Sequence, residues 1–187
     1  MQPEVIKKLF TVREYHRMGD VGILGPEDRT ELIDGEIIQM SPIGHRHSMS
    51  VARANHFFSA ALQGRAIINA QNPLVLNDYS EPQPDVVLLK FRSDFYKARA
   101  MVTAEDTLLV LEVSESSLQF DLNTKVPRYA LAGVPEVWIE NLNSDELLVY
   151  RDLSDDTYTT TLTLRRGDLV SVAAFPEILF KVDDLLG

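Results

Sequence analysis

The sequence predicts an α/β protein built around a mixed central sheet. Near-continuous apolar runs at Val86–Leu89 and Thr107–Val113 are typical of strands that are covered on both faces. Amphipathic segments at His47–Gln63 and Phe120–Ala132 are spaced as helices. The order helix, three strands, helix, strand through the middle of the chain therefore favours a sheet packed between helices.

Composition excludes several classes of protein. The 187 residues, of which 45% are hydrophobic, suit a single domain spanning 1–187 with its own core. The lack of cysteine excludes a disulfide scaffold, a zinc ribbon and a cysteine nucleophile. Apolar runs reach only about five residues where a membrane span needs about 20, and the start MQPEVIKKLF lacks the apolar stretch of a signal peptide. We therefore expect a soluble, cytoplasmic protein with no membrane partner.

The first part of the chain, 11–40, predicts a helix followed by a hairpin. Thr11 and Glu14 have the spacing of a capping box and open a helix that runs to Met18. Two apolar runs flank Asp34-Gly35, which is a strong signal for a two-residue hairpin turn.

The predicted core, about 44–141, begins with the helix His47–Gln63, whose apolar residues face inward. The helix Phe120–Ala132 is expected to have its N-cap near Asp121 and to carry Pro127 in its first turns. Strands are predicted within this core at Ala66–Ala70, Leu74–Leu76, Val86–Leu89, Thr107–Val113 and Val137–Ile139. The region 146–187 predicts added hairpin strands at Leu147–Tyr150, Tyr158–Leu164 and Leu169–Val172, closed by Ile178–Leu186.

Charge is distributed unevenly. The formal net charge of −10 argues against a protein built mainly to hold nucleic acid. All of it comes from residues 101–187, and no acidic residue occurs from Ile37 to Asn77, where Arg46, Arg53 and Arg65 lie. This window predicts either a locally positive surface or a chance gap in the acidic residues.

Two carboxylates interrupt the apolar strands. Glu112 lies within Leu108–Val113, and Asp85 stands at the start of Val86–Leu89. Because an ionised carboxylate is costly to bury without a partner, each needs a cation or a strand end. If the two strands are neighbours, the acids converge into a site that suits Mg²⁺. Alternatively, Asp85 caps a turn and Glu112 pairs with an arginine.

Lys125 follows four residues after Asp121 on the predicted second helix. An ion pair between these two residues is the simpler interpretation. The alternative has the lysine reach back to the acid pair, where its charge stabilises a phosphate or orients an attacking water.

These features resemble the PD-(D/E)XK nuclease superfamily, with Pro84-Asp85 and Glu112-Val113-Ser114 on the second and third core strands. More specifically, the chain resembles the Uma-two-type family of restriction endonucleases over about residues 11–151. The matching stretches are Glu31–Pro42, Gly44–His47, Ser80–Asp85, Leu111–Ser117, Asp121 with Lys125 and Tyr129-Ala130, and Ala132–Ile139.

The resemblance implies a restriction-endonuclease-like core and a two-carboxylate site in which Asp85 and Glu112 bind Mg²⁺ or Mn²⁺. It also implies that Ser114 stands where the superfamily has its strand lysine and that Lys125 replaces that lysine. Asp85, Glu112 and Lys125 are thus the expected catalytic residues. Glu31 is a candidate further metal ligand; alternatively, it is a surface acid that opens its strand.

Four residues are candidates for contact with nucleic acid. Arg46, at the start of the first core helix, and Arg53 are placed to position a phosphate backbone. His47 is either a site histidine or a histidine satisfied within the core. Gln83 either donates to a phosphate oxygen or satisfies backbone groups of its turn.

The leading hypothesis is a Mg²⁺-dependent endonuclease that hydrolyses phosphodiester bonds in DNA. One alternative is a binding module that keeps the nuclease fold without turnover, which the net charge and Ser114 favour. Another is a metal-dependent hydrolase with a different substrate. A homodimer is expected, because a fold of this kind commonly dimerises when it cuts both strands.

Overall fold

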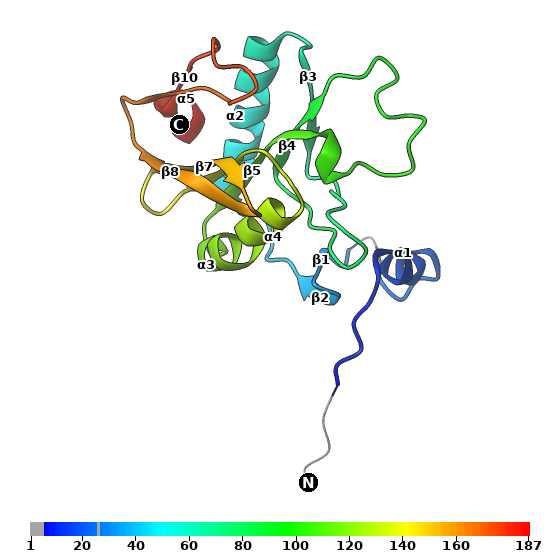
Figure 1. Ribbon diagram of the computed structural model, residues 1–187. Coiled ribbons are helices and arrows are strands. Elements are labelled where there is room, and N and C mark those ends of the chain that lie inside the picture. Colours follow the sequence, from blue (N-terminus) through cyan, green and yellow to red (C-terminus); the bar gives the residue numbers. More distant parts are fainter. Residues whose placement is uncertain (1–5, 26) are drawn as a thin grey trace.

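The computed structural model, which describes residues 6–25 and 27–187, contains a six-stranded mixed sheet with the strand order β3-β4-β5-β6-β7-β8 (Figure 1). β5 and β6 run parallel, and every other neighbouring pair in this sheet is antiparallel. The predicted α/β class is therefore confirmed. The strands are β3 Ala66–Ala70, β4 Val86–Lys90, β5 Thr107–Ser114, β6 Val137–Asn141, β7 Glu146–Ser154 and β8 Thr157–Leu164.

Both faces of the sheet are covered, which explains its continuous apolar strands. Leu109 and Leu111 of β5 belong to a core cluster formed with the helices α2 (His45–Leu62) and α5 (Val182–Leu186). Val110, between them, belongs to a second cluster that includes residues of α4 (Val126–Leu131). Alternate side chains of a strand point to opposite faces, so one strand supplies both cores.

The N-terminal part lies against the segment that leads into β4. Helix α1 (Val12–Asp20) begins with the predicted capping box, and β1 (Thr30–Ile33) pairs with β2 (Glu36–Gln39) in a separate hairpin. Leu32 exchanges backbone hydrogen bonds of 3.2 and 2.7 Å with Glu81. This contact brings β1 close to the end of the main sheet where β4 begins.

The predicted helix Phe120–Ala132 is wrong in its start and its regularity. It begins as α3 (Leu118–Phe120), widens into a π-helical segment, η2 (Asp121–Lys125), and continues as α4. The proline of α4 has no N–H to donate back along the helix, and a π-helical turn accommodates such a loss. The cap residue is Ser117, not Asp121, which is buried.

Two other strand predictions also differ from the structure. Residues 74–76 form only an isolated bridge, through Val75, rather than a strand. β9 (Leu169–Val170) pairs with β10 (Phe180–Lys181) in a small sheet of its own. A short 3₁₀ helix, η1 (Ala104–Asp106), precedes β5. Within the described ranges, no helix is long and apolar enough to cross a membrane.

Gly35, in the turn of the N-terminal hairpin, should tolerate substitution poorly. Its φ is +77°, and an added Cβ would lie 2.7 Å from Cβ of Leu9. We expect Gly35→Ala to lower the free energy of unfolding by about 2–4 kcal/mol, through backbone strain and overpacking. Gly64 is the control, since its φ is +82° but nothing lies within 4 Å of an added Cβ. Urea unfolding of Gly64→Ala should show a loss of only about 1 kcal/mol; equal losses would contradict the steric argument.

Candidate active site

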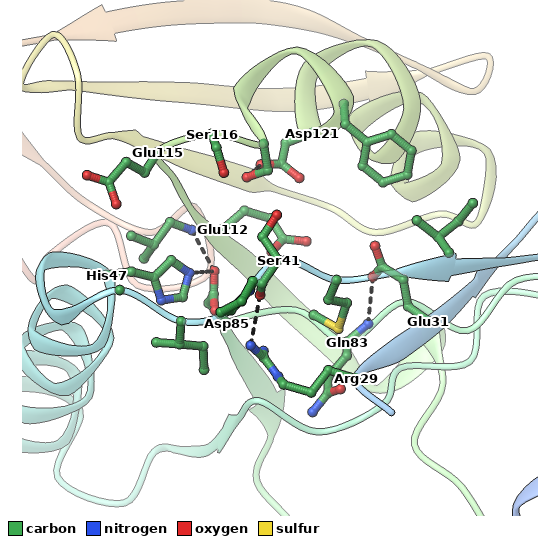
Figure 2. Close-up of a pocket in the computed structure, with 18 of the residues that line it drawn as sticks. Arg29, Glu31, Ser41, His47, Gln83, Asp85, Glu112, Glu115, Ser116 and Asp121 are labelled. Atoms are coloured by element: carbon green, nitrogen blue, oxygen red, sulfur yellow. Dashed lines mark hydrogen bonds and ion pairs between the residues drawn. The ribbon is translucent and has the colours of Figure 1, made fainter. Parts of the chain in front are cut away.

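Asp85 and Glu112 lie close together because their strands pair in antiparallel register. The pairing sets Val86 of β4 opposite Leu111 of β5, so the residue before Val86 lies beside the residue after Leu111. Both carboxylates line the same pocket, and Figure 2 shows them near its centre. The convergence expected from two acids at the ends of neighbouring strands is therefore present.

Glu112 is buried and is held by two donors from the helical segment that follows β5. Its Oε1 accepts a hydrogen bond of 3.1 Å from Nζ of Lys125 and one of 2.5 Å from the hydroxyl of Tyr129. Only 3% of the residue is exposed. The alternative in which Glu112 pairs with an arginine is therefore wrong.

Lys125 is surrounded by three carboxylates from three parts of the chain. Its Nζ lies 3.0 Å from Oε2 of Glu31, 3.1 Å from Oε1 of Glu112 and 4.0 Å from Oδ1 of Asp121. The lysine faces Asp121 on its own turn and also reaches Glu112 on the strand, so the contacts of both interpretations are present. Its action on a phosphate or an attacking water stays a prediction. Its side chain is only 5% exposed.

Burial and charge compete at this cluster. Burial acts to raise the pKa of Glu112 above its ordinary value, and the Lys125 ammonium opposes this effect. Burial alone would lower the pKa of Lys125, but the carboxylates of Glu112, Glu31 and Asp121 together raise it above its ordinary value. The lysine is thus a fixed positive charge and not a proton acceptor near neutral pH.

Asp85 is fixed from two sides. Its Oδ2 accepts a hydrogen bond of 2.8 Å from the backbone N–H of Val113 and lies 3.1 Å from Nε2 of His47. The hydrogen bond with Asp85 raises the pKa of His47 above its ordinary value. Of the two interpretations of His47, the site histidine agrees with this contact and with its place on the pocket wall. Asp85 contacts β5 directly, so the interpretation as a simple turn cap is wrong.

The pocket has a volume of about 320 Å³, at the small end of the range for ligand sites, about 300–1,000 Å³. The segment 39–44, from the last residue of β2 to the N-cap of α2, forms one wall, and Glu115–Ser117 forms another. Figure 2 shows Glu115 and Ser116 above Asp85 and Glu112, with Glu31 to the right and His47 to the left. A pocket of this size suits one small charged group; it does not form a broad groove.

The described residues fit a divalent cation only as a partial ligand set. No group of three or more His, Cys, Asp or Glu side chains arranged to hold a metal is found in 6–25 and 27–187. Oδ1 of Asp85 and Oε2 of Glu112, however, accept no hydrogen bond from any residue in those ranges. Mg²⁺ typically takes one or two carboxylates and completes its shell with water and substrate phosphate, which agrees with this pair.

Glu31 and Gln83 both line the pocket but are already engaged. Oε2 of Glu31 contacts Lys125 and accepts a hydrogen bond of 3.2 Å from the backbone N–H of Gln83. Glu31 is 4% exposed, so its interpretation as a surface acid is wrong. The side chain of Gln83 donates to the backbone carbonyl of Gln71, as the interpretation that it satisfies turn backbone expects.

Arg46 and Arg53 do not line the pocket. Arg46 pairs with Glu115 at 3.2 Å and donates to the carbonyl of Leu142 at 2.6 Å. Arg53 donates to the carbonyl of Leu185 at 3.2 Å, on the side of α2 that faces α5. Their contact with nucleic acid stays a prediction, and the structure gives both of them intramolecular partners.

Two residues of the site were missed in the sequence. Tyr129 follows Lys125 by four residues, and this helical spacing could have indicated that both reach the same acid. Arg29 lies in a Gly- and Asp-rich loop with no pattern of its own, and it lines the pocket only because β1 and β2 fold against the start of β4.

A buried acid lies behind the pocket. Glu140 of β6 is fully buried, and its Oε1 accepts a hydrogen bond of 2.5 Å from Oγ of Ser50 on α2. Its Oε2 and Nδ1 of His47 are buried without a hydrogen-bond partner among the described residues. Burial raises the pKa of Glu140 to about 7, against the opposing effects of Ser50 and Arg53.

Comparisons with known proteins identify the family and the fold of this chain. The model of the Uma2 family, described as "Putative restriction endonuclease", matches residues 12–183. A crystal structure from Anabaena variabilis, described as a putative nuclease belonging to DUF820, superposes with a TM-score of 0.75 at 18% identity. The match covers 95% of this chain and 97% of that one. A search of curated proteins finds no match.

The core of helix, three strands, helix and strand, with two acids at neighbouring strand ends, agrees with a restriction-endonuclease-like fold. Because the family model spans most of the chain, the protein belongs to the Uma2 family. The resemblance identified from the sequence is therefore confirmed.

Replacing Lys125 should destabilise the protein strongly. Lys125→Met leaves Glu31, Glu112 and Asp121 buried without their shared cation, and breaking a buried ion pair from one side costs about 3–5 kcal/mol. Urea unfolding measures the loss. The matched control is Lys181→Met on the exposed side of β10, which should change the free energy of unfolding by less than about 0.5 kcal/mol. Similar values for the two variants would contradict the role given to Lys125.

Glu140 should make stability fall as pH rises. A carboxyl with a pKa of about 7 in the folded protein and 4.5 when unfolded holds its proton more tightly when folded. Its contribution is therefore present below about pH 4.5 and is lost as pH rises through about 7, by at most about 3 kcal/mol. Glu140→Gln keeps an oxygen for Ser50 but cannot ionise. Between pH 5 and pH 8, the free energy of unfolding should fall less for Glu140→Gln than for the wild type. Equal falls for the two proteins would contradict the raised pKa given to Glu140.

Proposed function

We propose that the protein is a metal-dependent endonuclease that hydrolyses phosphodiester bonds in DNA. The observation that carries the proposal is the meeting of Asp85 and Glu112 in one pocket, with Lys125 in contact with Glu112. Family membership supports nuclease chemistry. DNA follows from the family description and from the superfamily, and a homodimer would allow both strands to be cut.

Each residue of the proposed site has a defined task. Asp85 and Glu112 would hold Mg²⁺ or Mn²⁺ through the oxygens that face the pocket. Held there, such a cation would supply Lewis-acid chemistry, lowering the pKa of a water and offsetting charge on the scissile phosphate. His47 and the N–H of Val113 orient Asp85, and Tyr129 orients Glu112.

Lys125 would act through its fixed charge. It donates to Glu112 and lies against Glu31, so it holds both carboxylates in place and limits their repulsion. Ser114, at the position of the superfamily's strand lysine, donates a hydrogen bond of 2.6 Å to Asp121. Asp121 in turn faces Lys125, so the serine supports the relocated lysine indirectly.

Removing either carboxylate should end cleavage and leave the fold intact. We expect Asp85→Asn and Glu112→Gln to lower the rate of nicking of supercoiled plasmid in Mg²⁺ or Mn²⁺ by more than about 100-fold, the upper range for loss of a partner that only orients a metal ligand. Calorimetric titration of Mn²⁺ should also show weaker binding to both variants.

Glu105→Gln is the matched control, because Glu105 is exposed and lies outside this pocket. Full cleavage by either Asp85→Asn or Glu112→Gln would refute the mechanism. Wild-type protein that binds Mn²⁺ but cuts no nucleic acid would favour the inactive binding module. Hydrolysis of other phosphoesters alone would favour the alternative hydrolase.

A further inference from the structure

Arg29 differs from the other cationic side chains of the pocket because it has no carboxylate partner among the described residues. Lys125 is matched by three carboxylates, and His47 by Asp85. Arg29 forms no salt bridge within residues 6–25 and 27–187, although it lines the same pocket. Its charge is therefore the one in this pocket that no carboxylate of the described residues offsets by a salt bridge.

The backbone of Arg29 is fixed to the neighbouring hairpin strand. Its carbonyl accepts a hydrogen bond of 2.8 Å from the backbone N–H of Met40 and one of 3.0 Å from the side chain of Gln39. Both donors belong to the segment that forms one wall of the pocket. Arg29 is thus a fixed part of the site, although it precedes β1 in a loop.

The guanidinium group keeps most of its donors free. Its Nη1 donates a hydrogen bond of 2.9 Å to the backbone carbonyl of Ser41, and the group makes no other hydrogen bond to the described residues. Figure 2 shows the Arg29 side chain extending towards Ser41, on the side of the pocket where Asp85 lies. A guanidinium has five N–H donors in a planar fork that matches two oxygens of a phosphate.

Charge in the rest of the pocket makes such a group necessary. Carboxylates of Glu31, Asp85, Glu112, Glu115 and Asp121 line it, so an anion that enters is repelled unless positive charge opposes them. Lys125 is already shared by three of these acids. Arg29, together with a divalent cation on the acid pair, is the remaining source of attraction.

We propose that Arg29 is the phosphate-binding residue of this pocket. Its guanidinium donates hydrogen bonds to a non-bridging oxygen of the nucleic-acid backbone beside the scissile phosphate. This inference rests on the proposed function, because it takes the ligand to be a phosphodiester. It assigns to Arg29 the contact that the sequence suggested for Arg46 and Arg53, both of which lie outside the pocket.

The test compares Arg29→Gln with Arg13→Gln, which removes the same charge from an exposed position on α1 outside this pocket. The probe is a short fluorescein-labelled DNA duplex, titrated by anisotropy in Ca²⁺ at several NaCl concentrations, with gels to confirm that it stays intact. Arg29→Gln should weaken binding about tenfold or more, as expected for loss of a charge-assisted hydrogen bond. The dependence of log K on log[salt] should become shallower by about 0.9.

One further variant and one further measurement separate a binding role from a structural one. Arg29→Lys keeps the charge but not the fork, so it should restore the salt dependence and only part of the affinity. Mn²⁺ binding, measured by calorimetry in the absence of DNA, should stay within about twofold of wild type in Arg29→Gln. Equal losses of DNA affinity in Arg29→Gln and Arg13→Gln would overturn the inference, as would loss of Mn²⁺ binding in Arg29→Gln.

Inorganic phosphate, titrated in Mg²⁺, distinguishes failure of this inference from failure of the proposed function. If the wild type binds phosphate but not DNA, and Arg29→Gln binds neither, then Arg29 does hold a phosphate group while the nuclease proposal fails. If the wild type binds DNA and Arg29→Gln binds it equally well, the inference fails while the nuclease proposal stands. If the wild type binds neither probe, the inference is overturned.

Discussion

The buried ammonium of Lys125 is the interaction on which the rest of the site depends. It joins Glu31 from the N-terminal hairpin, Glu112 from the central sheet and Asp121 from the π-helical segment. Three carboxylates cannot share a buried space without a cation, so the lysine determines whether the hairpin, the sheet and the helix can meet. Lys125 is the last residue of the π-helical segment and reaches Glu112 on the strand from there.

Around this ion cluster, most polar side chains restrain one another and few are left to meet a ligand. Tyr129 and Lys125 hold one oxygen of Glu112, while His47 and the N–H of Val113 hold one oxygen of Asp85. Each acid keeps one oxygen for the pocket. Two arginines of the window without acidic residues are used in a similar way, since Arg46 and Arg53 donate to backbone carbonyls of other elements. The site is therefore preorganised. Among the described residues of the pocket, Arg29 is the one whose positive charge is not paired with a carboxylate.

Sequence reasoning located the acids because burying a carboxylate in an apolar strand requires an explanation. The same reasoning left Lys125 open between a local ion pair and the strand acid, and it left His47 open between core and site, because periodicity shows which face of a helix a residue is on but not what that face meets. Tyr129 and Arg29 were missed for related reasons. A buried tyrosine looks like ordinary core, and a loop arginine has no periodicity from which to predict its position.

The sequence by itself determined the α/β class, the hairpin at Asp34-Gly35, the buried strands and the two acids, since these follow from local propensity, from alternation and from the cost of burying charge. Tertiary structure alone decided that Glu31 is buried, that Asp121 is not a helix cap and that Arg29 lines the pocket. Each of these depends on one contact between distant segments, the pairing of Leu32 with Glu81 or the packing of the π-helical turn on β5. Such contacts form only when segments far apart in the sequence meet in the folded protein. A local sequence pattern does not show which distant segments will meet.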